Sequence, residues 1–210
     1  MISNGQNKTA ANSPLPNGLV LAGGKSKRMG TDKGLMTWHG KQQRYYVAEL
    51  LRSSCQEVFI SCRAEQVDEI APSYHALADA VKDAGPLAGI ITAFKFQPDV
   101  AWLVVACDLP LIDERTISFL IQHRDSSAIA TTFESPFDGH PEPLVTIWEP
   151  SSLPILQTYL ADNFTCPRKA LIRNIERVKV LQSPHPQALM NANTPEDARL
   201  AGEIIAQTHN

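Results

Sequence analysis

The 210-residue sequence lacks the patterns that mark several protein classes. Its four cysteines are scattered with no CxxC pair, and no histidines stand at metal-ligand spacing, so neither a zinc site nor a disulfide framework is indicated. Reduced thiols in a cytoplasmic protein are the simpler interpretation. The longest apolar run, residues 101–107, is far too short to cross a bilayer, so no membrane segment is predicted.

A strong charge of one sign is also missing. The formal net charge is −3, so no basic footprint typical of nucleic-acid binding covers the chain, and any anion would be bound locally. Hydrophobic residues make up 43% and charged residues 20%, which is typical of a folded globular protein. Residues 1–17 are polar, rich in proline and asparagine, and without the apolar core of a signal peptide, which predicts a flexible tail before one domain at 18–210.

Strand-like and helix-like patterns alternate along that domain. Strands are predicted at residues 18–22, 57–62, 74–79, 101–107, 127–133, 143–148 and 178–182. Helices are predicted at residues 43–53, 65–71, 86–96, 113–123, after Ser151, near 168–174 and at 194–207. This alternation predicts an α/β fold, a three-layer α/β/α sandwich with a mostly parallel sheet and right-handed crossovers.

The stretch LVLAGGKSKRMGTDKGL, residues 19–35, follows the first predicted strand with two adjacent glycines and then four cations. Glycines let backbone N–H groups approach an anion closely, and the cations would neutralise it. The spacing matches neither the GxxxxGK[ST] nor the GxGxxG phosphate signature. A plain solvated turn and an anion-binding loop are therefore both open on this stretch alone.

Two aspartates stand at the ends of predicted strands, where ligands bind in open α/β sheets. Asp108 directly follows the apolar run 101–107 and suits a hard cation beside phosphate oxygens, with capping of the next helix as the alternative. Asp79 ends another strand and is either a nucleotide contact or a turn or capping residue. Cys107 is interpreted as a packing residue rather than a nucleophile.

Three further segments allow two interpretations each. In GPLAG, residues 85–89, helix N–H groups could face a ligand, or the small residues could let helix and sheet pack closely. In NANTPED, Thr194 starts a helix, whereas Asn191 and Asn193 precede it and are free to reach a site. His140, in a Gly/Pro-rich turn, is interpreted as solvated rather than catalytic.

Taken together, these motifs resemble those of the nucleotidyltransferases related to molybdenum cofactor guanylyltransferase. The pattern LAGGxSxRMGxDK of that family coincides with this chain at residues 21–33. The resemblance continues, in the same order, through Asp79, GPLAGI, VACDLPLI, PEPLVTIW and NANTPEDARL, and it covers roughly residues 18 to 205. It implies the Rossmann-like fold of nucleotide-diphospho-sugar transferases.

The resemblance also implies roles for individual residues. Leu21, Ala22 and Gly23 would contact the guanosine nucleotide, Gly24 and Arg28 would shape or charge the phosphate side of the loop, and Lys33 would sit on the phosphates. Asp79 would lie near the nucleotide, Asp108 would hold Mg²⁺ and touch the nucleotide, and Asn193 would lie near the metal or the pterin-side phosphate. Ser61 stands where some members carry a nucleotide-contacting asparagine, which weakens the expectation of base recognition there.

The activity that the resemblance implies is in-line transfer of GMP from GTP to molybdopterin, with release of pyrophosphate and formation of molybdopterin guanine dinucleotide. Lys33, Arg28 and Asp108 with Mg²⁺ would supply charge neutralisation and alignment. Expected partners are GTP, molybdopterin, and proteins that deliver the pterin or mature molybdoenzymes. A cytidylyltransferase on the same cofactor, a sugar- or alcohol-phosphate nucleotidyltransferase, and a non-catalytic nucleotide-binding module remain alternatives.

Overall fold

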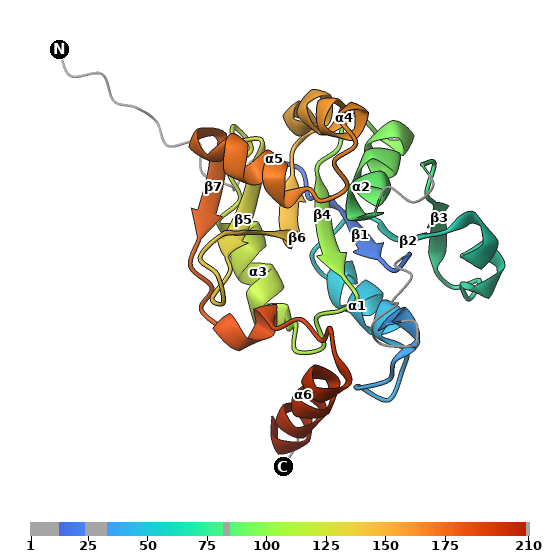
Figure 1. The fold of residues 1–210 in the computed structure, drawn as a ribbon. Coiled ribbons are helices and arrows are strands. Elements are labelled where there is room, and N and C mark those ends of the chain that lie inside the picture. The colour runs from blue at the N-terminus through green and yellow to red at the C-terminus, as the bar shows by residue number, and fades with distance from the viewer. Residues whose placement is uncertain (1–12, 24–32, 82–84, 209–210) are drawn as a thin grey trace.

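The fold is a seven-stranded sheet covered by helices on both faces (Figure 1), and the computed structural model describes residues 13–23, 33–81 and 85–208. The strands are β1 (Asn17–Leu21), β2 (Val58–Cys62), β3 (His75–Ala78), β4 (Trp102–Ala106), β5 (Ala130–Glu134), β6 (Pro141–Trp148) and β7 (Val178–Leu181). The α-helices are α1 (Gln43–Arg52), α2 (Gly85–Phe96), α3 (Glu114–Gln122), α4 (Leu153–Ala161), α5 (Arg168–Arg173) and α6 (Pro195–Thr208). Short 3₁₀ helices are η2 (Lys33–Leu35), η3 (Ala64–Glu69), η4 (Pro150–Ser152), η5 (Ile175–Arg177) and η6 (Pro186–Leu189).

The strand order in the sheet is β3-β2-β1-β4-β6-β5-β7. Neighbouring strands are parallel except where β6 pairs antiparallel with both β4 and β5. The mostly parallel sandwich predicted from the alternation of patterns is therefore confirmed. Because β6 alone runs in the opposite direction, its first residues lie at the edge of the sheet where β4 ends.

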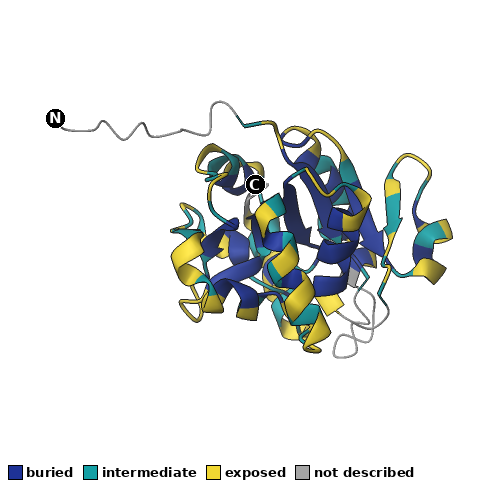
Figure 2. Ribbon diagram, turned by 90° about the horizontal axis from the view of Figure 1, so that it is seen from above, coloured by how far each residue is buried: buried dark blue, intermediate teal, exposed yellow. Residues whose placement is uncertain are grey.

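Two apolar cores form because successive strand residues point to opposite faces of the sheet. On β4, Leu103 and Val105 pack with the helices α1 and α3, whereas Trp102 and Val104 pack with α2, α4 and α5. All four side chains have no exposed surface, and Figure 2 shows the strands buried between helices whose outer faces are exposed. This double burial accounts for the wholly apolar run in the sequence.

Several element boundaries differ from the predicted ones. The structure has β1 beginning one residue early, at the buried Asn17, and β6 beginning at Pro141 rather than at 143. The segment expected as a short helix at 65–71 is the 3₁₀ helix η3. The strand expected at 127–133 is β5, at 130–134.

Candidate functional site

The carboxyl ends of β1, β2 and β4 meet at one edge of the sheet and bring several predicted residues together. The backbone N–H of Ala22 donates to the carbonyl of Ser61 at 3.0 Å, and the N–H of Cys107 donates to the carbonyl of Leu21 at 3.2 Å. Leu21 and Gly23 are partly exposed there, whereas Ala22 is buried. The end of β1 thus lies between the ends of β2 and β4, as ligand sites of open α/β sheets require.

Asp79, Ser61 and Gly23 form a close group on the β2 side of this edge. The Ser61 hydroxyl donates to Oδ1 of Asp79 at 2.5 Å, and the Asp79 N–H donates to the carbonyl of Cys62 at 2.8 Å. A Cβ placed on Gly23 would lie 3.1 Å from Oδ2 of Asp79, so glycine permits this approach. Burial raises the pKa of Asp79, and the hydrogen bond from Ser61 opposes that shift. Asp79 therefore presents a half-buried carboxylate at this edge of the sheet, next to Gly23 and Ser61.

The helix α2 packs directly against this group through Gly89. A Cβ on Gly89 would lie 2.6 Å from the Ser61 hydroxyl oxygen and 2.7 Å from Cδ2 of Leu21. Side chains do not pack this closely, so only glycine fits. Of the two interpretations of the GPLAG segment, close packing of helix and sheet has direct support at Gly89.

Asp108 stands in the turn after β4, beside the segment that contains Asn193. The backbone N–H of Ala192 donates to the carbonyl of Asp108 at 2.8 Å. The N-cap of α3 is Asp113, whose carboxylate accepts from the N–H of Thr116 at 2.8 Å, so Asp108 does not cap the helix that follows it. The interpretation of Asp108 as the N-cap of that helix is therefore wrong.

Asn193 directly precedes the start of α6. Thr194 accepts from the Asp197 N–H at 3.1 Å, and the Asp197 carboxylate accepts from the N–H groups of Asn193 and Thr194 at 3.0 and 2.8 Å. These reciprocal hydrogen bonds confirm that Thr194 caps α6, which begins at Pro195, and they fix the backbone at Asn193.

A buried carboxylate that the sequence analysis missed, Glu142, lies near Asp108. Burial raises the pKa of Glu142 and the negative charge of Asp108 adds to the shift, whereas the Arg168 guanidinium opposes it. Arg168 Nη2 donates to Glu142 Oε2 at 3.3 Å, and its Nη1 pairs with Asp138. A glutamate between two prolines in an otherwise apolar strand was the signal available in the sequence.

The polar side chains at this edge present mainly oxygen atoms, and these are the ligands that a hard divalent cation such as Mg²⁺ prefers. In the described parts of the chain, no three His, Cys, Asp or Glu side chains gather as a metal site. An ion held by Asp108 would therefore take further ligands from substrate phosphates and water, as Mg²⁺ does in many phosphate-transferring sites.

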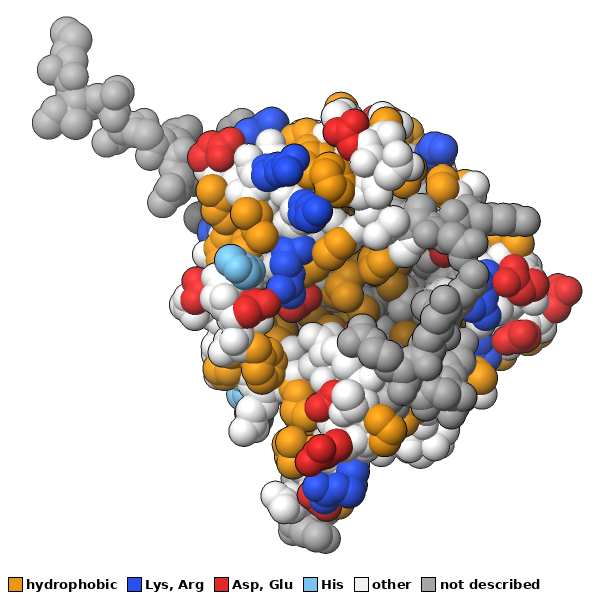
Figure 3. Space-filling model, viewed as in Figure 1, with side chains coloured by type: hydrophobic (Ala, Val, Ile, Leu, Met, Phe, Trp, Pro, Cys, Tyr) orange, Lys and Arg blue, Asp and Glu red, His pale blue; other side chains and the backbone are white. Residues whose placement is uncertain are grey.

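The structure gives no side-chain position for three of the predicted residues, Gly24, Arg28 and Lys33. Gly24 and Arg28 lie outside the described residues, and Lys33 opens η2 with its backbone alone described. His140 is exposed in the turn between β5 and β6, and Cys107 is buried, as predicted for a solvated histidine and a packing cysteine. Figure 3 shows hydrophobic side chains in the middle of the face seen in Figure 1, with Lys and Arg side chains gathered over α5.

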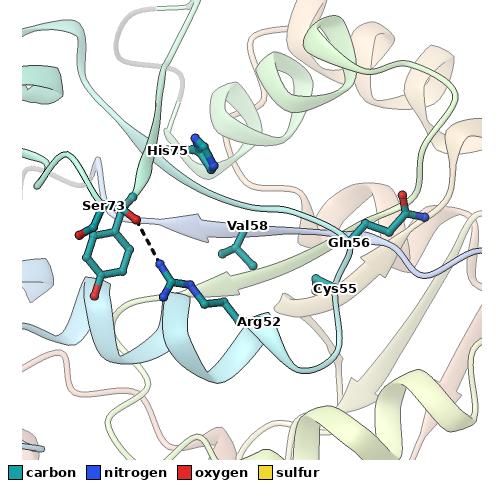
Figure 4. Close-up of a pocket in the computed structure, with 7 residues that line it drawn as sticks. Arg52, Cys55, Gln56, Val58, Ser73 and His75 are labelled. Atoms are coloured by element: carbon teal, nitrogen blue, oxygen red, sulfur yellow. Dashed lines mark hydrogen bonds between the residues drawn. The ribbon is translucent and has the colours of Figure 1, made fainter.

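A separate pocket lies at the opposite edge, where β2 and β3 begin (Figure 4). Its lining residues are Arg52, Cys55, Gln56, Val58, Ser73, Tyr74 and His75. Arg52 Nη2 donates to the Ser73 carbonyl at 3.1 Å, and burial raises the pKa of the Cys55 thiol to about 12. That thiol is therefore protonated at neutral pH and unsuited to nucleophilic chemistry.

Within the described residues, no helix combines the length and the apolar composition that crossing a membrane requires.

Comparisons with known proteins agree on one family. The family model of the MobA-like NTP transferase domain matches residues 18–178. A molybdenum cofactor guanylyltransferase from Pseudomonas entomophila is 33% identical over 188 residues, which cover 87% of this chain and 96% of that protein. A molybdenum cofactor biosynthesis bifunctional protein from Synechocystis is 34% identical over 181 residues. That match covers 86% of this chain, and the chain spans about half, 52%, of the bifunctional protein.

Among solved structures, the molybdopterin-guanine dinucleotide biosynthesis protein A from Archaeoglobus fulgidus has the same fold. The TM-score is 0.74 at 24% identity, and the match covers 91% of this chain and 99% of that one. The topology that positions the edge of the sheet described above is therefore shared with a solved relative.

Proposed function

The chain belongs to the family of MobA-like NTP transferase domains, and from this premise we propose that it transfers GMP from GTP to molybdopterin, producing molybdopterin guanine dinucleotide and pyrophosphate. The observation that carries the proposal is the meeting of the Leu21–Gly23 backbone, the Asp79 carboxylate and the Asp108 turn at one edge of the sheet. Relatives that carry the guanylyltransferase name and align over most of their length support the choice of substrates. Proteins that deliver molybdopterin or receive the product are expected partners.

The reaction needs no protein nucleophile. An oxygen of the molybdopterin phosphate attacks the α-phosphorus of GTP and forms a new P–O bond. The bond from the α-phosphorus to the oxygen that bridges to the β-phosphorus breaks, and pyrophosphate leaves with that electron pair. The protein must therefore align two polyanions and neutralise their charge.

The residues divide between these tasks. Backbone N–H groups of Gly23 and Gly24, with the Arg28 and Lys33 cations, would hold the triphosphate. Asp108 would hold Mg²⁺, with Asn193 beside it, and the ion would supply positive charge at the phosphate oxygens when bound.

The nucleoside end would lie over β2. Ser61 donates to one oxygen of Asp79, which keeps that carboxylate oriented at the site. Carboxylate oxygens accept from hydroxyl or N–H groups, both of which a nucleoside presents. We therefore assign Leu21, Ala22, Ser61 and Asp79 to the nucleoside side of the site.

Substitution of the two charged residues tests the proposal. Lys33→Ala and Asp108→Ala are each expected to slow pyrophosphate release from GTP and molybdopterin by about 10²- to 10³-fold, because each removes a preorganised charge. Their melting temperatures should barely move. Lys95→Ala, which removes an exposed lysine from the last turn of α2, is the matched control and should retain full activity. Activity near that of the unaltered protein in either test variant would contradict the assigned role.

The choice of nucleotide is tested by thermal shift. GTP with Mg²⁺ is expected to raise the melting temperature more than CTP with Mg²⁺ at equal concentrations, since at equal concentration the ligand with the lower Kd stabilises the folded state more. Preferential stabilisation by CTP would replace the guanylyl assignment with a cytidylyl one. Tight GTP binding without pyrophosphate release in the presence of molybdopterin would indicate a non-catalytic module.

A further inference from the structure

The helix α1 carries a polar side chain at a position where its periodicity requires an apolar one. Gln43, Val47 and Leu51 are four residues apart, so they share the face of α1 that packs on the sheet. All three have no exposed surface. Val47 and Leu51 belong to the apolar core, and Gln43 continues their stripe toward the turn after β4.

The side chain of Gln43 is hydrogen-bonded to Leu109, the residue that follows Asp108. Its Nε2 donates to the carbonyl of Leu109 at 3.0 Å. Two neighbours act on the same turn, since His39 Nε2 donates to the Pro110 carbonyl at 2.8 Å and the Tyr46 hydroxyl donates to the Ile112 carbonyl at 3.4 Å. Three side chains between residues 39 and 46 therefore hold the backbone of the turn that contains Asp108.

The first part of this region is a small hairpin, residues 36–42, which lies between η2 and α1 and is closed by Gln43. The Gln43 N–H donates to the Met36 carbonyl at 2.8 Å, Thr37 and Gln42 form an antiparallel bridge, and Gly40 turns the chain at a φ of +71°. Since η2 begins at Lys33, the hairpin directly follows the segment that carries this lysine.

The same hairpin also touches the helix that follows Asn193. Trp38 Nε1 donates to the Ala198 carbonyl in α6 at 3.3 Å. The hairpin thus joins three segments to which the proposed function assigns charge or metal binding, those of Lys33, Asp108 and Asn193.

Stability alone does not account for a glutamine at this position. Oε1 of Gln43 is buried and has no hydrogen-bond partner among the described residues. A buried acceptor without a partner costs stability, whereas an apolar side chain of similar size would extend the stripe of Val47 and Leu51 without that cost. The contact from Nε2 to Leu109 is what the glutamine adds.

We propose that Gln43 is a positioning residue for the transfer reaction: through the Leu109 carbonyl it sets the place of the Asp108 carboxylate relative to the Lys33 segment. The inference rests on the proposed function, because it presumes that Asp108 binds a divalent cation with the nucleotide. His39 assists Gln43 by holding the next carbonyl of the same turn. Partners that orient a metal ligand typically matter by about 10- to 100-fold in metal affinity or activity.

Gln43→Met is the test variant, because methionine has a similar length, fills the apolar stripe and cannot donate to Leu109. The factor by which Mg²⁺ tightens GTP binding, measured by calorimetry with and without the ion, is expected to fall by about ten-fold or more. The magnesium concentration for half-maximal activity should rise, and kcat should fall more than the KM for molybdopterin rises.

Gln97→Met is the matched control. Gln97 accepts a hydrogen bond from the buried Asn17 at the opposite edge of the sheet, so its loss also removes a side-chain hydrogen bond and should lower only the melting temperature. His39→Phe is the second variant, since it keeps a ring to stack on Tyr46, whose centroid lies 3.7 Å from that of His39, but removes the donor to Pro110. It should shift the magnesium response in the same direction as Gln43→Met, and it decides the question if Gln43→Met does not fold.

The possible failures are distinguishable. An unchanged magnesium response in folded Gln43→Met or His39→Phe, with unaltered protein that binds GTP in a magnesium-dependent way, would overturn the positioning role alone. Unaltered protein whose GTP binding does not respond to Mg²⁺ would overturn the proposed function and this inference with it. An equal loss of magnesium response in Gln97→Met would show that the effect reports general destabilisation, which also overturns the inference.

Discussion

Replacing Gly89 by alanine would insert one methyl group at the point where α2 meets Leu21 and Ser61. The new Cβ would lie 2.6 Å from the Ser61 hydroxyl oxygen and 2.7 Å from Cδ2 of Leu21. Carbon atoms in contact are normally about 3.5 to 4.0 Å apart, so both neighbours must move by roughly 1 Å. The Leu21 methyl is the end of a flexible side chain and can move. The Ser61 hydroxyl is hydrogen-bonded to Asp79 at 2.5 Å, so moving it disturbs that hydrogen bond.

Two effects of opposite sign determine the size of the change. Alanine in the interior of a helix is more stable than glycine by about 1 kcal/mol. An extra methyl in a well-packed region typically costs about 1 to 3 kcal/mol. Displacing Ser61 from Asp79 adds the loss of one hydrogen bond to a carboxylate, about 1.5 to 3 kcal/mol. The steric and hydrogen-bond costs together exceed the helix gain, so a net loss of about 2 to 4 kcal/mol is expected.

Urea unfolding measures this loss, and GTP binding by calorimetry reports its effect on Asp79. Gly202→Ala is the matched control, because a Cβ on Gly202 in α6 meets nothing within 4 Å and the variant should gain up to about 1 kcal/mol. Adding Ser61→Ala to Gly89→Ala removes the obstructing hydroxyl, so Gly89→Ala should cost less stability in that background. If Gly89→Ala were as stabilising as Gly202→Ala and bound GTP normally, the close contact inferred between α2 and the site would be refuted.

Two further predictions concern buried charges. Burial raises the pKa of Asp79 above its unfolded value of 3.8, so its favourable contribution to stability is present below that value and is lost as pH rises through the folded pKa. Asp79→Asn should therefore flatten the fall in melting temperature as pH rises through this acidic window, and an unchanged slope would contradict the assignment. Arg124 pairs with Glu149 through two hydrogen bonds of 2.6 and 2.8 Å, with side chains 9% and 4% exposed. Arg124→Met should cost about 3 to 5 kcal/mol in urea unfolding by leaving a buried charge, and adding Glu149→Leu should recover most of it.

The order of the elements and the position of Asp108 after β4 were predictable from local patterns. The apolar run 101–107 is typical of a strand buried on both faces, and Asp108, directly after it, therefore falls at the edge where ligands bind in such sheets. The start of α6 was equally local, because Thr194 and Pro195 carry the chemistry of a helix beginning. Such features need no knowledge of the rest of the chain.

The direction of β6 and its early start could not be predicted in this way. An apolar run has the same pattern in both directions, so pairing with β4 and β5 decides the orientation. Pro141 and Glu142 suggest a turn, yet they form the first two residues of β6. Pro141 pairs with Glu134 of β5, beyond a shift in register between Thr132 and Glu134. There the Thr132 hydroxyl donates to the Glu142 carbonyl at 2.6 Å.

Polar side chains that make contacts distant in sequence account for the other residues missed. Arg168 lies 26 positions from Glu142, and Gln43 lies 66 positions from Leu109, so no local pattern connects either pair. The break in the stripe of Val47 and Leu51 indicates only that Gln43 is unusual. Its contact with the Leu109 carbonyl depends on how α1 packs against the turn after β4 in the folded protein.

The reversed strand β6 has a consequence for how such an enzyme can diversify. Because β5 ends and β6 begins at the edge where β4 ends, the turn at residues 135–140 lies at that edge, where its Asp138 contacts Arg168, and is several strands away from Asp79. Residues 136–140 are exposed, and Gly139 has nothing within 4 Å of where a Cβ would stand. The length and composition of this turn can therefore change without disturbing the strands that carry Ser61 and Asp79.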